Sequence, residues 1–274
     1  ASLERACFGP EAKTRIIALA SPQLDAYVRT HATPPSRLAV LPPTVEPSWR
    51  PSVAPAPEQR AALRAKYGLD ERAVTWLWVG LQPRVKGLDR AIAALASQPD
   101  ARLLVCGAEK SRRQVSALLA DASRSGLAER IRVFGMVPDS RVLGELFAAA
   151  DLLVHPARLD VTGTVILEAI VSGLPVITTE NCGYSLHVKA ADGGIVLPVP
   201  FDPASLDRAL AAADAPRRAV WSRNCLTYGS RPALYSGFAR AADLIEAAAL
   251  SDDRSWNSAG GLNDPRPQAP DRSH

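Results

Sequence analysis

The chain has 274 residues, a formal net charge of +4 and a pI near 9.0. Hydrophobic residues make up 47% of it, enough to bury the core of one large domain or two small ones. The weakly basic balance fits phosphate-bearing ligands or an anionic membrane surface, and no Lys/Arg block with interleaved aromatics indicates nucleic acid as a partner. The sequence has no signal peptide and no apolar run near the ~18–20 residues that span a bilayer.

Four cysteines are spread along the chain without a C-x-x-C pair: Cys7, Cys106, Cys182 and Cys225. We therefore expect neither a zinc site nor a redox pair, and free thiols favour a reducing, cytoplasmic location. The chain begins with Ala1 and its only methionine is Met136. We interpret it as a fragment or processed form of a longer protein.

The first part of the chain has short apolar runs that predict strands at residues 15–20 and 38–41. Between them we expect a helix at 22–31, with Ser21 as its N-cap followed by a proline at the first helical position. Residues 42–57 contain six prolines, which indicates an extended connection and a domain boundary.

From residue 58 to 250, apolar runs of four to six residues alternate with helical patterns. The expected strands are 74–79, 103–106, 131–134, 151–155, 176–179 and 194–197. The expected helices are 58–67, 88–96, 112–125, 139–150, one starting near 164, 203–213, 217–230 and 234–250. Only a turn, at 181–183, is expected between the last two strands. Strands that are apolar throughout predict a Rossmann-like α/β fold, with a parallel sheet covered on both faces.

Residues 155–175 form the most informative stretch, because a buried strand is followed by a loop of small residues and then a helix. The start of such a helix offers free N–H groups and a positive dipole end to an anion. Asp160 lies eight positions before Glu168, so a carboxylate stands on either side of that anion site. A nucleotide sugar, with its phosphates and two sets of hydroxyls, suits this pattern. A simple turn glycine at Gly163 and a solvated Glu168 remain the alternative.

Lys86 and Arg84 follow the strand at 74–79, which ends at Gly80. In open α/β sheets, ligands bind beyond the carboxyl ends of strands. Two cations there could stabilise a diphosphate leaving group, although a solvated basic loop is the commoner case. His155 has no His or Cys near it in sequence, so we interpret it as structural and expect no metal. The nucleophile-elbow, dinucleotide-binding and P-loop patterns are absent.

Several segments together resemble the retaining family 4 glycosyltransferases of GT-B fold, and among them the lipopolysaccharide core glucosyltransferases. The resemblance covers most of residues 1–245. The segments that carry it are ERACF at 4–8, LPP at 41–43, KGLDR at 86–90, AAADLLVHPA at 148–157, LEAI at 167–170, SGLPVITT at 172–179 and NCGY at 181–184.

The resemblance implies roles for individual residues. Glu168 would bind the donor ribose, and Asp160, one methylene shorter than the family's Glu, the hydroxyls of the transferred sugar. Lys86 and Arg84 would bind the diphosphate. The family has an Arg-Lys-Gly triplet here, and in this chain Val85 stands at the position of its Arg. The remaining expected donor contacts are the N–H groups of Thr164 and Val165, close approach at Gly163 and Gly80, and the base-contacting loop at Val137.

The resemblance also implies the activity, which is transfer of a hexose, with glucose from UDP-glucose as the first choice, to the lipopolysaccharide inner core with retained configuration. No cofactor is implied. The acceptor would bring the protein to the inner face of the inner membrane as a peripheral, cytoplasmic enzyme. The implied domains are an acceptor-domain remnant at 1–45, a linker at 46–57, the nucleotide-sugar-binding domain at 58–230, a crossover helix at 231–250 and a disordered tail at 251–274.

Because most of the acceptor domain would be missing, we expect this chain to bind the donor but to transfer little on its own. A second hypothesis is a nucleotide-sugar-binding module without catalysis, either a degenerate remnant or one half of a split enzyme. Asp160 and Val85, where the family has Glu and Arg, favour that hypothesis. A third is a GT-B sugar-nucleotide epimerase, which the wider resemblance disfavours.

Overall fold

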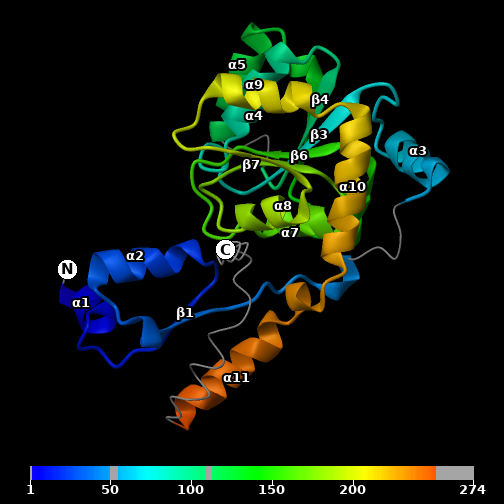
Figure 1. Cartoon of the computed structure of the whole chain (residues 1–274). Helices are drawn as coiled ribbons and strands as arrows, with labels where there is room; N and C mark the ends of the chain where they lie inside the picture. The colour runs from blue at the N-terminus through cyan, green and yellow to red at the C-terminus, as the bar shows by residue number, and fades with distance from the viewer. Residues whose placement is uncertain (1, 50–54, 109–112, 251–274) are drawn as a thin grey trace, which may run out of the picture. The chain divides into compact units, whose positions relative to one another are not determined.

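The computed structural model describes residues 2–49, 55–108 and 113–250 (Figure 1). The described residues divide into two compact units, one made of 2–46 and 231–250 and the other of the described parts of 47–230. The tail predicted at 251–274 lies outside the described residues.

The smaller unit contains two short parallel strands and three helices. They are α1 (Ser2–Phe8), β1 (Ile16–Ala18), α2 (Pro22–His31), β2 (Leu38–Val40) and α11 (Gly237–Ala249), with 3₁₀ turns at Pro35–Arg37 and Pro232–Tyr235. Leu244 of α11 is fully buried and packs against Ala39 of β2. Ser21 is the N-cap residue of α2 and a proline follows it, as predicted, but its backbone angles are helical and its side chain makes no capping bond.

The larger unit is built on a six-stranded, wholly parallel sheet in the order β5-β4-β3-β6-β7-β8. Its strands are β3 (Val74–Val79), β4 (Ala101–Cys106), β5 (Ile131–Gly135), β6 (Leu152–His155), β7 (Val176–Thr179) and β8 (Gly194–Leu197). These match the predicted strands to within two residues. They form because buried, largely β-branched and aliphatic runs can pack on both faces at once.

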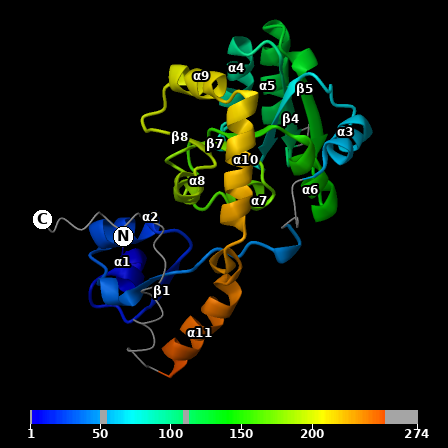
Figure 2. The same ribbon diagram turned by 45° about the vertical axis from the view of Figure 1, so that its right-hand side comes forward.

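Helices cover both faces of this sheet, with α4, α5 and α9 on one side and α7 and α8 on the other (Figures 1 and 2). The helices are α3 (Pro57–Lys66), α4 (Leu88–Ala94), α5 (Arg113–Arg124), α6 (Ser140–Ala149), α7 (Thr164–Val171), α8 (Ser185–Ala191), α9 (Pro203–Ala212) and α10 (Ala215–Gly229), with 3₁₀ turns at Pro47–Trp49, Leu95–Ser97 and Ala128–Arg130. The predicted fold class is confirmed.

Alternate strand residues face opposite layers, although nearly all are buried. Trp76 and Trp78 of β3 belong to the core cluster that includes Leu88 and Leu95, on the side of α4. Leu77 lies between them in sequence, is fully buried, and belongs to the opposite face. The core therefore consists of two layers separated by the sheet.

The prediction missed two seven-residue helices, α1 and α8. Residues 181–183 form the expected turn, but α8 follows it directly. Its N-cap residue, Tyr184, makes no side-chain capping bond. A helix this short gains its stability mainly from tertiary packing, so local pattern gives little signal for it.

The strand order places a switch point between β3 and β6. After β3 the chain continues outward to β4 and β5, and then returns to β6 on the other side of β3. Crevices beyond the carboxyl ends of strands at such points are where ligands bind in open α/β sheets. The loops at 80–87 and 156–163 flank this point.

Candidate functional site

The loops after β3 and β6 lie directly against each other. Gly87 has a φ of +76°, and a Cβ there would lie 2.1 Å from the Pro156 carbonyl oxygen, so only glycine fits without a shift. The Arg158 amide donates to the Val85 carbonyl at 2.8 Å. The Arg158 guanidinium also makes two bonds, of 2.8 and 2.7 Å, to the Asp89 carboxylate. These contacts fix the position of each loop relative to the other.

Asp160 lies at the centre of a polar cluster between these loops. Its Oδ1 is 2.8 Å from the Lys86 ammonium and accepts a 3.0 Å bond from the Gly163 amide. Its Oδ2 is 2.9 Å from Nε2 of His155. The side chains of Asp160 and Lys86 are 12% and 21% exposed, and that of His155 is only 1% exposed. The cluster is therefore open to solvent mainly on the Lys86 side.

Electrostatics in the cluster favour ionised partners. Burial by itself would raise the pKa of Asp160, but His155 and Lys86 outweigh it, so the Asp160 pKa is lowered. Burial would likewise lower the pKa of His155, but the bond to Asp160 and the neighbouring Cys182 thiol leave the His155 pKa raised. The Cys182 pKa is lowered because His155 and the Thr178 and Thr179 hydroxyls outweigh its burial. Each of the three pKa shifts thus favours the charged form of its own group, whether His155, Asp160 or Cys182.

The first turn of α7 offers the free amides that the sequence pattern predicts. Gly163, the N-cap, has a φ of +75°. Its own amide is bonded to Asp160 and so is not free. Among the described residues, no acceptor is recorded for the amides of Thr164 and Val165, as expected in the first turn of a helix. The two amides and the positive end of the helix dipole make this a candidate anion site, next to Lys86 and Asp160.

Glu168 lies one turn further into α7 and is partly buried. Burial raises the pKa of its carboxyl group. Within the described parts of the chain, no group is recorded as donating a hydrogen bond to this carboxylate. A half-buried carboxylate without a partner is costly, and ligand hydroxyls could supply the missing donors.

The structure brings together Lys86, Asp160 and Gly163, but not all of the predicted site residues. The exposed Arg84 contributes its carbonyl to Arg158 at 2.6 Å, and no contact of its side chain with the cluster is recorded among the described residues. Gly80 follows β3 and donates to the Cys106 carbonyl at 3.0 Å. Val137 is half-buried after β5, the edge strand of the sheet, two strands away from β3.

Three residues that shape the two loops and the cluster were not predicted as functional: His155, Arg158 and Cys182. We predicted a structural role for His155 because no other His or Cys lies near it in the sequence. Cys182 reaches it only because β6 pairs with β7, where Thr178 bonds both the His155 carbonyl (3.0 Å) and the Cys182 sulfur (3.2 Å). The signal that could have indicated His155 and Arg158 was their position within five residues of Asp160, in one loop.

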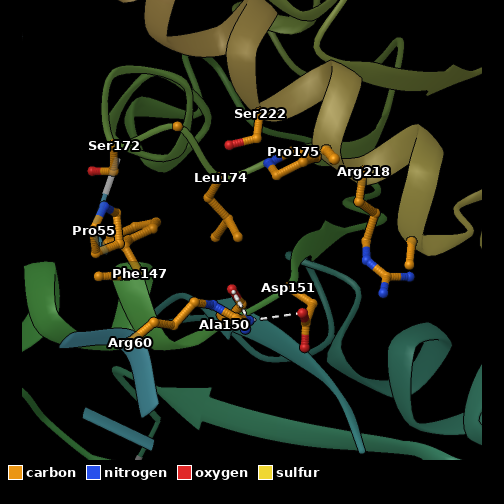
Figure 3. Close-up of a pocket in the computed structure, with 14 residues that line it drawn as sticks. Pro55, Arg60, Phe147, Ala150, Asp151, Ser172, Leu174, Pro175, Arg218 and Ser222 are labelled. Atoms are coloured by element: carbon orange, nitrogen blue, oxygen red, sulfur yellow. Dashed lines mark hydrogen bonds and ion pairs between the residues drawn. The ribbon is translucent and has the colours of Figure 1, made fainter. Parts of the chain in front are cut away.

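A pocket of about 350 Å³ lies elsewhere in this unit, beside Asp151 and Pro175 (Figure 3). Because these residues immediately precede β6 and β7, the pocket lies at the amino ends of the strands, opposite the anion site. Leu174 points into it, and Arg60 pairs with Asp151 at 2.7 Å. Since these charged groups are paired with each other, this pocket is not our candidate for the donor site.

No group of three His, Cys, Asp or Glu side chains in the described ranges could hold a metal ion. Metal-independent chemistry stays a prediction. No helix in those ranges is long and apolar enough to cross a membrane.

Residues 59–224 match the model of the family described as "Glycosyl transferases group 1", and the chain belongs to this family. A parallel sheet with a crevice at its switch point is the arrangement in which open α/β folds bind ligands. The resemblance inferred from the sequence is thus confirmed at the level of the family.

Among individual proteins, the chain is similar to lipopolysaccharide glucosyltransferase WaaG of Escherichia coli K12, with 36% identity over 89% of this chain and 65% of that protein. The crystal structure of WaaG superimposes with a TM-score of 0.79 at 35% identity, covering 89% of this chain and 66% of that one. D-inositol 3-phosphate glycosyltransferase of Segniliparus rotundus is 29% identical over 67% of this chain and 40% of its own length.

The structure of Anabaena HepE, solved with UDP-glucose, has a TM-score of 0.72 at 20% identity, covering 88% of this chain and 64% of that one. This likeness shows the fold, which is the GT-B type shared by WaaG and HepE. The chain spans about two thirds or less of the length of each of these relatives.

Proposed function

We propose that this chain binds a nucleotide-sugar donor at the switch point between β3 and β6. The observation that carries the proposal is the set of groups at this point: a lysine, and two amides and a carboxylate for which no partner is recorded among the described residues. They are Lys86, Thr164, Val165 and Glu168. Cation and amides match a diphosphate, and a carboxylate one helical turn away matches a ribose. Family membership supports the same ligand class.

Within this proposal, the diphosphate lies against the first turn of α7, with Lys86 and the exposed Arg84 supplying positive charge. Glu168 accepts hydrogen bonds from the ribose hydroxyls, and Val137 contacts the base. Gly80 and Gly163 leave room for the donor next to the backbone. When the bond between the sugar and the diphosphate breaks, charge develops on the leaving group, and the cations and amides stabilise that charge.

The reaction that we propose for the whole protein is transfer of a hexose, glucose from UDP-glucose, to the inner core of lipopolysaccharide with retained configuration. The similarity to WaaG supports the donor and the acceptor. The acceptor would be bound with the help of an N-terminal domain or a partner chain. A lipid-linked acceptor places the protein peripherally on the inner face of the inner membrane, in the cytoplasm.

Calorimetric titration of the 274-residue chain with UDP, GDP and UDP-glucose tests the proposal. We expect micromolar to low-millimolar UDP affinity and much weaker GDP binding. Undetectable binding of all three ligands to a folded chain would contradict the proposal.

A second candidate function is donor binding without transfer, favoured by Asp160 and Val85 at positions where the family has Glu and Arg. It predicts UDP-glucose binding with no glucosyl transfer even after an acceptor domain is supplied. The discriminating measurement is radiolabelled transfer to lipopolysaccharide core by this chain combined with the residues encoded upstream of it.

A further inference from the structure

The Asp160 carboxylate is occupied by protein donors in a way that the family resemblance does not predict. An ionised carboxylate offers about four lone-pair sites. Lys86 and the Gly163 amide occupy Oδ1, and His155 occupies Oδ2. Since the side chain is also one methylene shorter than Glu, it is held within the loop and has little capacity left for sugar hydroxyls.

We propose that Asp160 is a positioning residue that holds the Lys86 ammonium beside the first turn of α7, with His155 as its buried anchor. The proposal rests on the donor-binding function above and deepens it. In this proposal Asp160 does not contact the sugar. It acts on diphosphate binding through Lys86, and the diphosphate is common to UDP and UDP-glucose.

His155 is suited to anchor Asp160 because the sheet itself fixes it. It is the last residue of β6, paired in register with Thr178 of β7, and its carbonyl accepts a 3.0 Å bond from the Thr178 hydroxyl. The ring is almost fully buried, and its Nδ1 has no hydrogen-bond partner among the described residues. The polar neighbours of this ring are therefore Asp160, bonded to Nε2, and the Cys182 thiol.

Lys86 is held at both ends. Trp78 of β3 donates its indole N–H to the Lys86 carbonyl at 3.0 Å, which fixes the backbone. The ammonium bonds Asp160 at 2.8 Å and approaches the Leu159 carbonyl at 3.4 Å. A lysine side chain loses considerable rotamer entropy when it is ordered, so prior ordering removes part of the cost of binding an anion.

The test compares UDP and UDP-glucose affinities of the full chain and its Asp160→Asn variant by calorimetry. We expect both affinities to fall by about the same factor, roughly tenfold for the loss of one charge-assisted bond to Lys86. Loss of UDP-glucose affinity with UDP affinity retained would overturn the proposal in favour of a sugar contact, and so would no change in either. Failure of the unmodified chain to bind UDP would instead overturn the proposed function.

A double-mutant cycle separates positioning from a general structural effect. If Asp160 acts through Lys86, Asp160→Asn should have little further effect on UDP affinity in a Lys86→Met background, whereas independent roles give additive losses. If Asp160→Asn does not fold, His155→Gln takes its place in both experiments. A His155→Gln protein that folds and binds UDP as tightly as the unmodified chain would overturn the anchoring role.

Discussion

Arg158 and Asp89 form a doubly hydrogen-bonded ion pair between the loop after β6 and the first turn of α4, with N–O distances of 2.8 and 2.7 Å. The same guanidinium donates to the Arg84 carbonyl at 2.6 Å. One side chain therefore ties together both loops of the proposed site, although Arg158 itself is 43% exposed. Its role is geometric, because it fixes the loop that carries Lys86.

Replacing Arg158 by alanine should weaken UDP binding severalfold while costing only about 0.5–1 kcal/mol of stability, because half-exposed pairs contribute little to folding. Calorimetry and thermal denaturation measure the two effects. Arg124→Ala is the matched control, since Arg124 also pairs with an aspartate but lies on α5 and is 71% exposed. Equal UDP affinities for the two variants would show that the Arg158 contacts do not order the site.

Glu168→Gln should stabilise the fold at neutral pH and weaken UDP binding. Burial raises the Glu168 pKa above 4.5, so the folded state holds this proton more tightly than the unfolded chain does. The free energy of unfolding therefore falls as pH rises from about 4.5 through the raised pKa, and a neutral amide removes that loss.

The expected gain for Glu168→Gln at pH 7 is about 0.5–2 kcal/mol, with a UDP affinity about tenfold to a hundredfold lower. Denaturant titrations at pH 4 and 7 measure the first effect, and calorimetry the second. Glu71→Gln, at an exposed position outside the site, should change neither quantity. Lower stability of Glu168→Gln at pH 7 would show that the carboxylate already has a stabilising partner.

Gly87→Ala should destabilise the larger unit by at least about 2 kcal/mol, because a left-handed backbone and a clash with the Pro156 carbonyl combine. Gly144→Ala is the control. Gly144 lies inside α6, and a Cβ there would meet nothing within 4 Å. This change should therefore stabilise the larger unit, by at most about 1 kcal/mol. Thermal melts of the two variants should shift in opposite directions, and a common shift would contradict the close packing of the two loops.

Arg64→Met should cost at least about 3 kcal/mol, since it leaves several carbonyls without the buried guanidinium that donates to them. It also removes one of the two arginines that pair with Asp151, which keeps Arg60. Arg64 is 3% exposed, bonds Asp151 at 3.1 Å, and donates to the carbonyls of Ala149 (3.0 Å) and Ala73 (2.7 Å). Arg60 also pairs with Asp151 but is 33% exposed, so Arg60→Met should cost about 1 kcal/mol or less. Urea denaturation gives both values, and an equal or larger loss for Arg60→Met would refute this ranking.

Several parts of the candidate site could be predicted locally. The apolar run Val74–Val79 is a strand with the predicted ends. Asp139, where the helix at 139–150 was expected to begin, is the N-cap of α6 and accepts a bond from the Arg141 amide. The helix start after Gly163 was also predictable, because a loop of small residues there separates a buried strand from an apolar run with helical spacing. The two seven-residue helices were missed, since packing stabilises them more than propensity does.

The sequence by itself determined a parallel α/β sheet with its binding loops at one edge, because strand burial and helix periodicity are local properties. Only the tertiary structure decided that Lys86 and His155 both contact the Asp160 carboxylate. That meeting depends on β6 pairing with β3, whose register joins Trp76 to Leu152. Strand order is set by how the helices and strands pack over long sequence separations, and no local pattern encodes it.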